Sequence, residues 1–281
     1  MSAAALRAAG LRAAAGAAVV GWAVRRQLAT RVSDQARWTR SNHRGVSVSL
    51  LGGPALAAGL ACGSVLGGGL RAGTAGVVAV TGAAAFGLVD DLAEDDGQVR
   101  KGLRGHIGAL AKGELTTGGL KVLGIGAASL LAGAIATGGR YPPGSLRRAF
   151  DVVSSGALIA GTANLVNLLD LRPGRALKAG ALLAVAGLGR SGGPQAAACL
   201  GGAAVALGAD LAERDMIGDS GANALGALVG TALVLGSSRP GRLALLAGVV
   251  GLTLASERVS FSEVIARHRL LHAIDGWGRR G

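Results

Sequence analysis

The sequence predicts an all-α fold: a polytopic bundle of about nine transmembrane helices, with eight to ten as the range, in one integral membrane domain over residues 1–281. Half of the residues are hydrophobic and the mean hydropathy is positive, which is typical of membrane proteins. The apolar residues form long blocks separated by short charged stretches. Basic residues are concentrated in alternate stretches, which gives the bundle two different ends.

The apolar blocks define the expected spans. A helix needs about 20 apolar residues to cross a hydrocarbon core of roughly 30 Å, and fewer where the bilayer thins locally. The expected spans are residues 4–24, 48–69, 72–89, 117–137, 152–169, 177–190, 195–211, 221–236 and 242–256.

The 50 glycines of the chain also favour a membrane protein. In soluble helices each glycine costs about 1 kcal/mol relative to alanine, whereas in a bilayer glycines let helix backbones approach closely. The spacing of Gly59, Gly63 and Gly67, and of Gly226 and Gly230, therefore predicts tight helix packing.

The placement of basic residues predicts the orientation. With the N-terminus outside, residues 25–47, 90–116, 170–176, 212–220 and the tail 257–281 lie inside, and with Lys178 they hold 19 of the 29 Lys and Arg residues. Cytoplasmic loops show this bias, so the net charge of +13 does not indicate a nucleic-acid partner. We expect a multi-pass protein of the cell (plasma) membrane with its active face in the cytoplasm. Basic residues just after the first block favour a retained anchor over a cleaved signal peptide.

Adjacent carboxylates open the second inner segment. Asp90 and Asp91 directly follow an apolar block, where such charges are costly unless a cation neutralises them. Mg²⁺ suits this position because it usually takes one or two carboxylates and fills its other positions with water and substrate phosphates. A solvated acidic loop is the alternative, and we expect that role for the nearby Glu94, Asp95 and Asp96.

The fifth block ends in a polar stripe. Asn164, Asn167 and Asp170 recur every three residues, so a helix displays them on one face. Arg172 and Arg175 follow and favour a phosphate site. Hydrogen bonds to neighbouring helices are the alternative interpretation of the stripe.

Two glycine motifs precede apolar blocks. Gly52-Gly53-Pro54 is compatible with a motif that only marks the start of a helix. In Gly218-Asp219-Ser220-Gly221, either Asp219 or Ser220 is a candidate cap, and backbone N–H groups at a helix start also bind phosphate.

The cysteines and the tail histidines carry little functional signal. Cys62 and Cys199 lie in apolar blocks without metal-like spacing, which predicts buried, unpaired thiols. His268 and His272 are four residues apart on an expected tail helix, but without a third ligand we expect ordinary surface histidines.

In their order along most of the chain, the polar motifs resemble those of the polyprenyl-phosphate N-acetylhexosamine-1-phosphate transferase superfamily, glycosyltransferase family 4, which includes the phospho-MurNAc-pentapeptide translocase. The motifs are Leu51-Gly-Gly-Pro54, Gly87-Leu-Val-Asp90-Asp91, Arg100-Lys101-Gly102-Leu103, Asn164-Leu-Val-Asn167-Leu-Leu-Asp170, Ile217-Gly-Asp219-Ser-Gly221 and the tail segments Ser260-Phe-Ser-Glu-Val-Ile265 and Asp275-Gly-Trp-Gly-Arg279.

The resemblance implies transfer of a sugar 1-phosphate from a UDP-sugar to a membrane polyprenyl phosphate, with UMP released at the cytoplasmic face, for cell-envelope glycan synthesis. It implies Mg²⁺ as the cofactor, and a second copy of the chain is a candidate partner in a homodimer. The implied roles are catalysis by Asp90, Asp91 and Asp219, metal binding by Asp219 and Asp91, and substrate binding by Asn167, Asp170, Lys101 and Lys112.

The segment after Asp170 departs from the family pattern. The family commonly has a second Asp and a Gly-Leu-Ala-like run, whereas this chain has Leu171-Arg172-Pro173-Gly174-Arg175. The departure motivates the alternative of a catalytically altered member that binds a lipid carrier or acts as a scaffold. A small-solute transporter is a third hypothesis, supported by the polar stripe alone and opposed by the lack of an evident inverted repeat.

Overall fold

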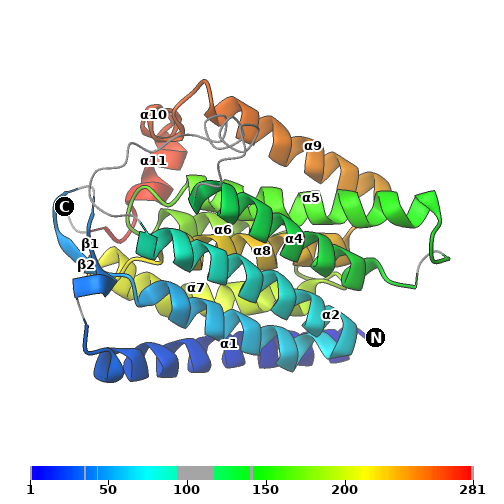
Figure 1. The fold of residues 1–281 in the computed structure, drawn as a ribbon, viewed down its shortest axis with the longest axis horizontal. Coiled ribbons are helices and arrows are strands. Elements are labelled where there is room, and N and C mark those ends of the chain that lie inside the picture. The colour runs from blue at the N-terminus through cyan, green and yellow to red at the C-terminus, as the bar shows by residue number, and fades with distance from the viewer. Residues whose placement is uncertain (1, 35, 43, 94–116, 140–141, 280–281) are drawn as a thin grey trace.

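The computed structural model describes residues 2–34, 36–42, 44–93, 117–139 and 142–279. These residues form ten α-helices, a 3-10 turn and a two-stranded antiparallel hairpin, and the longer helices pack side by side in a bundle (Figure 1). The helices are α1 (Ala3–Arg31), α2 (Gly52–Ala93), α4 (Thr117–Thr137), α5 (Leu146–Leu168), α6 (Arg175–Val185), α7 (Gly193–Leu211), α8 (Gly218–Gly236), α9 (Arg239–Ser256), α10 (Phe261–Arg267) and α11 (Arg269–Gly276). The turn η1 covers Ala36–Trp38, and the strands are β1 (Thr39–Ser41) and β2 (Ser47–Ser49).

The second and third expected spans are both parts of α2. The backbone leaves the helical region at Gly69 (φ 62°, ψ −177°), and the chain folds back on itself there (Figure 1). A Cβ on Gly76 would lie 3.0 Å from Cβ of Ser64. In a straight helix, residues twelve positions apart would be separated by about 18 Å, so the two halves of α2 pack against each other. The helix begins at Gly52 rather than at residue 48, because residues 47–49 form β2.

The all-α membrane architecture is confirmed, but the number of spans is not. Four described helices, α1, α2, α4 and α5, are long and apolar enough to cross a membrane, and the bent pair of α9 and α10 makes a fifth if it counts as one span. The other expected spans also lie on helices, except that the span 177–190 continues past the end of α6 at Val185. The 11 residues of α6 extend only about 17 Å, little more than half of the hydrocarbon core.

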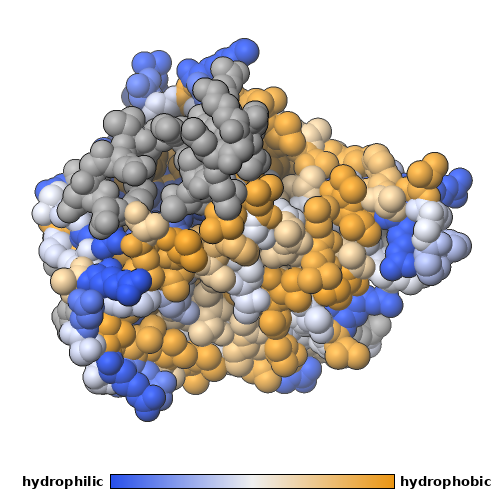
Figure 2. Space-filling model, viewed as in Figure 1, coloured by the Kyte–Doolittle hydropathy of each residue, from blue (hydrophilic) through white to orange (hydrophobic). Residues whose placement is uncertain are grey.

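The outer surface supports a multi-pass membrane protein. Large apolar side chains face outward along several helices, for example Val19 (62% exposed), Val65 (60%), Leu131 (55%) and Val153 (59%). On the face drawn in Figure 2, a broad apolar surface separates two ends where hydrophilic residues gather. Apolar exposure on this scale is rare on soluble monomers and matches a surface that faces lipid.

The glycine spacings pack helices as predicted. A Cβ at Gly59, Gly63 or Gly67 would lie under 3.0 Å from the α1 backbone at Ala17, Ala13 or Ala9, respectively. Gly226 and Gly230 meet the backbone of α5 in the same way. The two glycine rows therefore bring α2 onto α1 and α8 onto α5 at backbone contact distance.

Helix α8 lies at the centre of the bundle. Every residue from Ser220 to Ala232 is buried. Side chains such as Leu225 and Leu228 join a core formed with α1, α2, α6 and α7, whereas Ala227 and Val234 join a second core formed with α2, α4, α5 and α9. Residues at the start of α8 are consequently held from several sides.

The described parts of the segments expected on the inner side gather at one end of the bundle, which we call the carboxylate end because it holds Asp90, Asp91 and Asp219. Arg25, near the end of α1, binds the Asp215 carboxylate through Nε (2.8 Å) and Nη2 (2.5 Å). Arg40 of β1 donates to the backbone carbonyl of Asp91 at 2.7 Å. The hairpin and α11 lie at this end, and the N-terminus lies at the opposite end (Figure 1).

The hairpin was not predicted. The side chain of Asn42 accepts hydrogen bonds from the N–H groups of Arg44 (2.9 Å) and Val46 (3.0 Å), an Asx arrangement that fixes a turn. Ser49 of β2 accepts from the N–H of Met216 at 2.9 Å and forms a bridge with Asp215. The hairpin is thereby attached to the segment that leads into α8.

The thiols and the tail histidines agree with expectation in being unpaired and exposed, respectively, but not in every detail. Cys62 and Cys199 are unpaired, Cys199 is buried and Cys62 is partly buried. His268 and His272 are exposed, and the tail helix breaks at His268, so the two residues do not share one helix.

Candidate functional site

Asp91 binds the start of α8. Its carboxylate accepts hydrogen bonds from the backbone N–H groups of Asp219 and Ser220, both at 2.9 Å. Those groups belong to the first turn of a helix, where backbone donors have no partner within the helix. Asp91 is only 9% exposed, and its charge suits the positive end of the α8 dipole. Asp91, a predicted metal ligand, therefore acts here as the cap of α8.

Two glycines allow this contact. Gly218, the first residue of α8, has a φ of 54°, a conformation that residues with a Cβ rarely adopt. Gly87 lies one helical turn before Asp91, and a Cβ there would lie under 3.0 Å from the backbone of Asp219. The end of α2 and the start of α8 thus touch through their backbones. The first glycines of α2 approach the same segment, since a Cβ on Gly53 would also lie under 3.0 Å from the backbone of Ile217.

Lys121 joins the other two carboxylates. It lies near the start of α4, and its Nζ is 3.1 Å from Oδ2 of Asp90 and also binds Oδ2 of Asp219. The three side chains are partly buried, with 14% of Lys121, 16% of Asp90 and 29% of Asp219 exposed. One cation from α4 therefore bridges two carboxylates from α2 and α8, and we call these three residues the carboxylate–lysine cluster.

Sequence reasoning missed Lys121. Lys121 lies within the expected span 117–137 and is assigned no role from the sequence alone. The available signal was a lone cation within an apolar block, because an ionisable residue in a membrane helix marks a functional site more often than not.

The polar stripe of α5 reaches the same region. Asp170 lies in the turn that follows α5. Its burial, together with the nearby carboxylates of Asp210, Asp219 and Asp91, raises its pKa well above the ordinary value. Oδ1 of Asn167 is buried without a hydrogen-bond partner among the described residues. The stripe thus adds an uncompensated acceptor and a fourth carboxylate beside the carboxylate–lysine cluster, and Asn164 lies partly buried one turn earlier.

The two arginines after the stripe have different surroundings. Arg172 is exposed. Arg175 is buried and bound to Asp275 of α11 through Nε (2.8 Å) and Nη2 (3.0 Å), while its Nη1 donates to Ser262 at 2.8 Å. Arg279 binds the same carboxylate at 2.5 Å. Arg175, a predicted phosphate ligand, therefore attaches the tail to α6, with each of its three side-chain nitrogens donating to a tail residue.

Asp275 is the acidic centre of this attachment. Burial alone would raise its pKa, but hydrogen bonds and charges from Arg175 and Arg279 outweigh that effect and lower the pKa to about 2. Lys178 donates to the backbone carbonyls of Ile274 (3.0 Å) and Asp275 (2.9 Å). Sequence reasoning assigned Asp275 only to a family-like tail and gave it no partner.

Few described side chains at the carboxylate end could coordinate Mg²⁺. In the described ranges, no group of three or more His, Cys, Asp or Glu side chains has the geometry to hold a metal ion. Asp90 and Asp219 do converge on one cation, Lys121, and the unpartnered oxygen of Asn167 lies on the adjoining stripe. Mg²⁺ commonly takes only one or two protein carboxylates beside water and phosphate. Asp90 and Asp219 supply that number of carboxylates, and in this structure both are bound to Lys121.

Two predicted phosphate contacts, Lys101 and Lys112, lie outside the described residues, as do Glu94, Asp95 and Asp96. Comparison of the sequence with protein-family models and with curated proteins found no match.

Proposed function

We propose that the chain is a Mg²⁺-dependent transferase of the polyprenyl-phosphate N-acetylhexosamine-1-phosphate type. It moves a sugar 1-phosphate from a UDP-sugar to a membrane polyprenyl phosphate and releases UMP, as a step of cell-envelope glycan synthesis. In this proposal the chain crosses the plasma membrane about nine times, and its carboxylate end faces the cytoplasm.

The observation that carries the proposal is the carboxylate–lysine cluster at one end of a membrane bundle. Asp90, Lys121 and Asp219 come from three helices that are far apart in the sequence. Charged groups near a membrane core cost free energy, so those that occur there usually serve a function. A phosphate reaction between a soluble nucleotide and a lipid needs cations and carboxylates at the membrane surface, and the order of the motifs along the chain supports this reaction.

The chemistry assigns different work to each residue. An oxygen of the acceptor phosphate forms a bond to the β-phosphorus of the UDP-sugar, and the bond from that phosphorus to the oxygen bridging the two phosphates breaks, so UMP leaves with the electron pair. Asp90 accepts the proton of a singly protonated acceptor phosphate, and Lys121 offsets phosphate charge. Asp219 would hold Mg²⁺, and the bound ion would supply further positive charge for the diphosphate. Asp91 positions Asp219 by capping α8.

The test is UMP release by the purified protein with Mg²⁺, a panel of UDP-sugars and undecaprenyl or decaprenyl phosphate. We expect turnover with at least one donor, and a loss of about 100-fold or more in Asp90→Asn and Asp219→Asn, the size of effect seen when one charge-stabilising group is removed. Glu263→Gln is the control, because this side chain is 67% exposed on α10. A folded preparation that turns over no donor of a broad panel would overturn the proposal.

The second candidate is a non-catalytic protein that binds a lipid carrier or acts as a scaffold. The bond between Arg175 and Asp275 favours it, because it withdraws a predicted phosphate ligand from the site. This candidate predicts that Asp90→Asn and Asp219→Asn leave the cellular phenotype intact. A lost phenotype at normal protein levels excludes it.

A further inference from the structure

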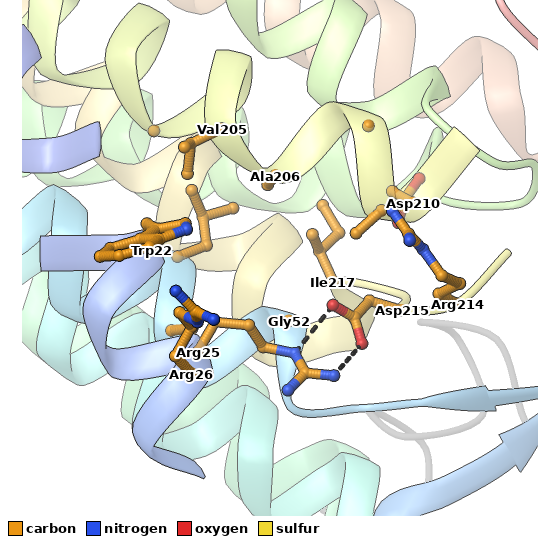
Figure 3. A pocket seen from close by; sticks show the side chains of 16 residues that line it. Trp22, Arg25, Arg26, Gly52, Val205, Ala206, Asp210, Arg214, Asp215 and Ile217 are labelled. Carbon is orange, nitrogen blue, oxygen red and sulfur yellow. Dashed lines mark hydrogen bonds and ion pairs between the residues drawn. The ribbon is translucent and has the colours of Figure 1, made fainter. Parts of the chain in front are cut away.

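A cavity lies at the carboxylate end, between α1, α7 and the start of α2, whereas the carboxylate–lysine cluster lies on α2, α4 and α8. It has a volume of about 300 Å³ and is enclosed by α1, α7, the start of α2 and the segment that leads into α8. Figure 3 shows Trp22 and Arg25 of α1, Val205 and Ala206 of α7, and Asp215 around it. None of Asp90, Lys121 and Asp219 lines it. The cavity is therefore separate from the proposed catalytic site.

The cavity has apolar walls and lies beside lipid-facing surface. Leu56, Val205 and Ala206 contribute aliphatic lining. Trp22 is 52% exposed and Val205 is 39% exposed, so the lining continues onto the outer face of α1 and α7. Val19, one turn before Trp22, is 62% exposed. The cavity therefore adjoins apolar outer surface on α1 and α7.

Two arginines that line the cavity are available to bind an anionic ligand. Both carboxylates that line it are occupied: Asp215 binds Arg25 through two hydrogen bonds, and Asp210 accepts from the backbone N–H of Gly174. Arg26 and Arg214 are exposed lining residues, and neither has a carboxylate partner in the described part of the chain. The guanidinium of Arg26 lies 4.9 Å from the ring centre of Trp22, which keeps it at the opening.

The residues at the cavity opening are also typical of a membrane–water interface. Tryptophan is enriched at that level of a membrane protein, and basic residues next to it attract anionic head groups. Trp22 and Arg26 are one turn apart on α1, so one side chain can lie among acyl chains while the other meets phosphate. The cavity is at the small end of ligand pockets, about 300–1,000 Å³, and suits a head group with the upper part of one chain.

We propose that this cavity binds an anionic phospholipid of the surrounding bilayer. Its phosphate contacts Arg26 and Arg214, and an acyl chain lies against Leu56, Val205 and Ala206. The binding does not depend on the transferase activity, so it can be tested, and can fail, independently of the proposed function.

Quenching of Trp22 by brominated lipid tests the proposal. The chain has three tryptophans, so Trp38→Phe and Trp277→Phe leave Trp22 as the only reporter. The full-length protein is reconstituted in phosphatidylcholine bilayers that contain either brominated phosphatidylglycerol or brominated phosphatidylcholine at equal mole fraction. We expect stronger quenching by phosphatidylglycerol, and a fall of about fivefold in its relative affinity for each arginine removed in Arg26→Gln and Arg214→Gln.

Arg7→Gln is the matched control, because it removes the same charge from an exposed site on the opposite end of α1, and it should keep the preference. Equal quenching by the two brominated lipids would overturn the proposal, as would a preference that survives in the Arg26→Gln/Arg214→Gln double variant. Loss of the preference on addition of inorganic phosphate at constant ionic strength would assign the site to a free anion and overturn it. Displacement by undecaprenyl phosphate but not by the same amount of unlabelled phosphatidylglycerol would assign the cavity to the acceptor lipid and also overturn it.

Discussion

Replacing Lys121 with methionine removes one charge and little volume from the carboxylate–lysine cluster. In the wild-type chain, Nζ of Lys121 binds both Asp90 and Asp219. Methionine can fill the same space but donates no hydrogen bond. The variant leaves two partly buried carboxylates facing each other without the cation that separates them.

The size of the effect follows from burial. A hydrogen bond to a charged group contributes about 1.5–3 kcal/mol, and removal of one partner from a buried ion pair costs about 3–5 kcal/mol. Because 16% of the Asp90 side chain and 29% of the Asp219 side chain are exposed, solvent screens the interaction and lowers these free-energy costs. We therefore expect Lys121→Met to lower the free energy of unfolding by about 2–3 kcal/mol.

The assay is reversible unfolding in mixed micelles with increasing denaturing detergent, for the wild type, Lys121→Met and Lys121→Arg. Lys121→Arg keeps the charge and should lose less than Lys121→Met. In an Asp90→Asn/Asp219→Asn background, the cost of Lys121→Met should fall below about 1 kcal/mol, because the charges it balances are gone. Arg172→Met removes a cation from an exposed position near the same end and should change stability by less than about 0.5 kcal/mol. If Lys121→Met costs the same with and without the two carboxylates, the reasoning about this cluster is wrong.

Three further changes test other parts of the structure. Gly87→Ala should destabilise the protein by about 1–3 kcal/mol because its Cβ would overlap the backbone at the start of α8, whereas Gly126→Ala, which meets nothing within 4 Å, should not; equal unfolding midpoints would contradict this. The lowered pKa of Asp275, about 2, means that its stabilisation is complete above its ordinary pKa of 3.8 and is lost as the pH falls towards 2. This contribution is about 1 kcal/mol after allowance for solvent screening, and Asp275→Asn should reduce the change in stability across that window by about that amount. Asp151→Asn should cost about 3–5 kcal/mol because it breaks the buried ion pair between Asp151 and Arg242, whose Nη2 lies 2.7 Å from Oδ1. The double variant Asp151→Asn/Arg242→Met should recover part of that loss in a double-mutant cycle.

The fold was predictable to the extent that hydropathy and small residues determine it. Apolar blocks located all the long helices, and the glycine rows of α2 and α8 correctly indicated tight packing. Two adjoining blocks of span length predicted separate spans 48–69 and 72–89, and the backbone turns at Gly69, the last residue of the first. The hairpin of residues 39–49 was not predicted, because its strands have three residues each and depend on the bonds of Ser49 to the segment before α8, a contact between distant parts of the chain.

The candidate site was predictable in its location but not in its bonding. The charge bias correctly placed Asp90, Asp91 and Asp219 at one end of the bundle, because alternate connections of antiparallel helices meet there. Nothing in the sequence distinguishes Asp90 from Asp91, since which of two adjacent carboxylates meets α8 depends on the rotation of α2. The role of Arg175 was equally hidden, because its partner Asp275 lies 100 positions away.

The different bonding of the adjacent carboxylates decides how catalysis should be tested. Asp91 holds two N–H groups of α8, and an amide oxygen carries a weaker charge for that purpose, so Asp91→Asn weakens the placement of Asp219 whether or not the protein is an enzyme. Loss of function in Asp91→Asn therefore does not separate a transferase from a scaffold. Asp90 contacts Lys121 and has no bond to the α8 backbone in the described residues. Asp90→Asn should keep the stability of α8, so a loss of UMP release without a loss of stability would identify Asp90 as part of the chemistry, whereas equal losses of both would assign it to the structure.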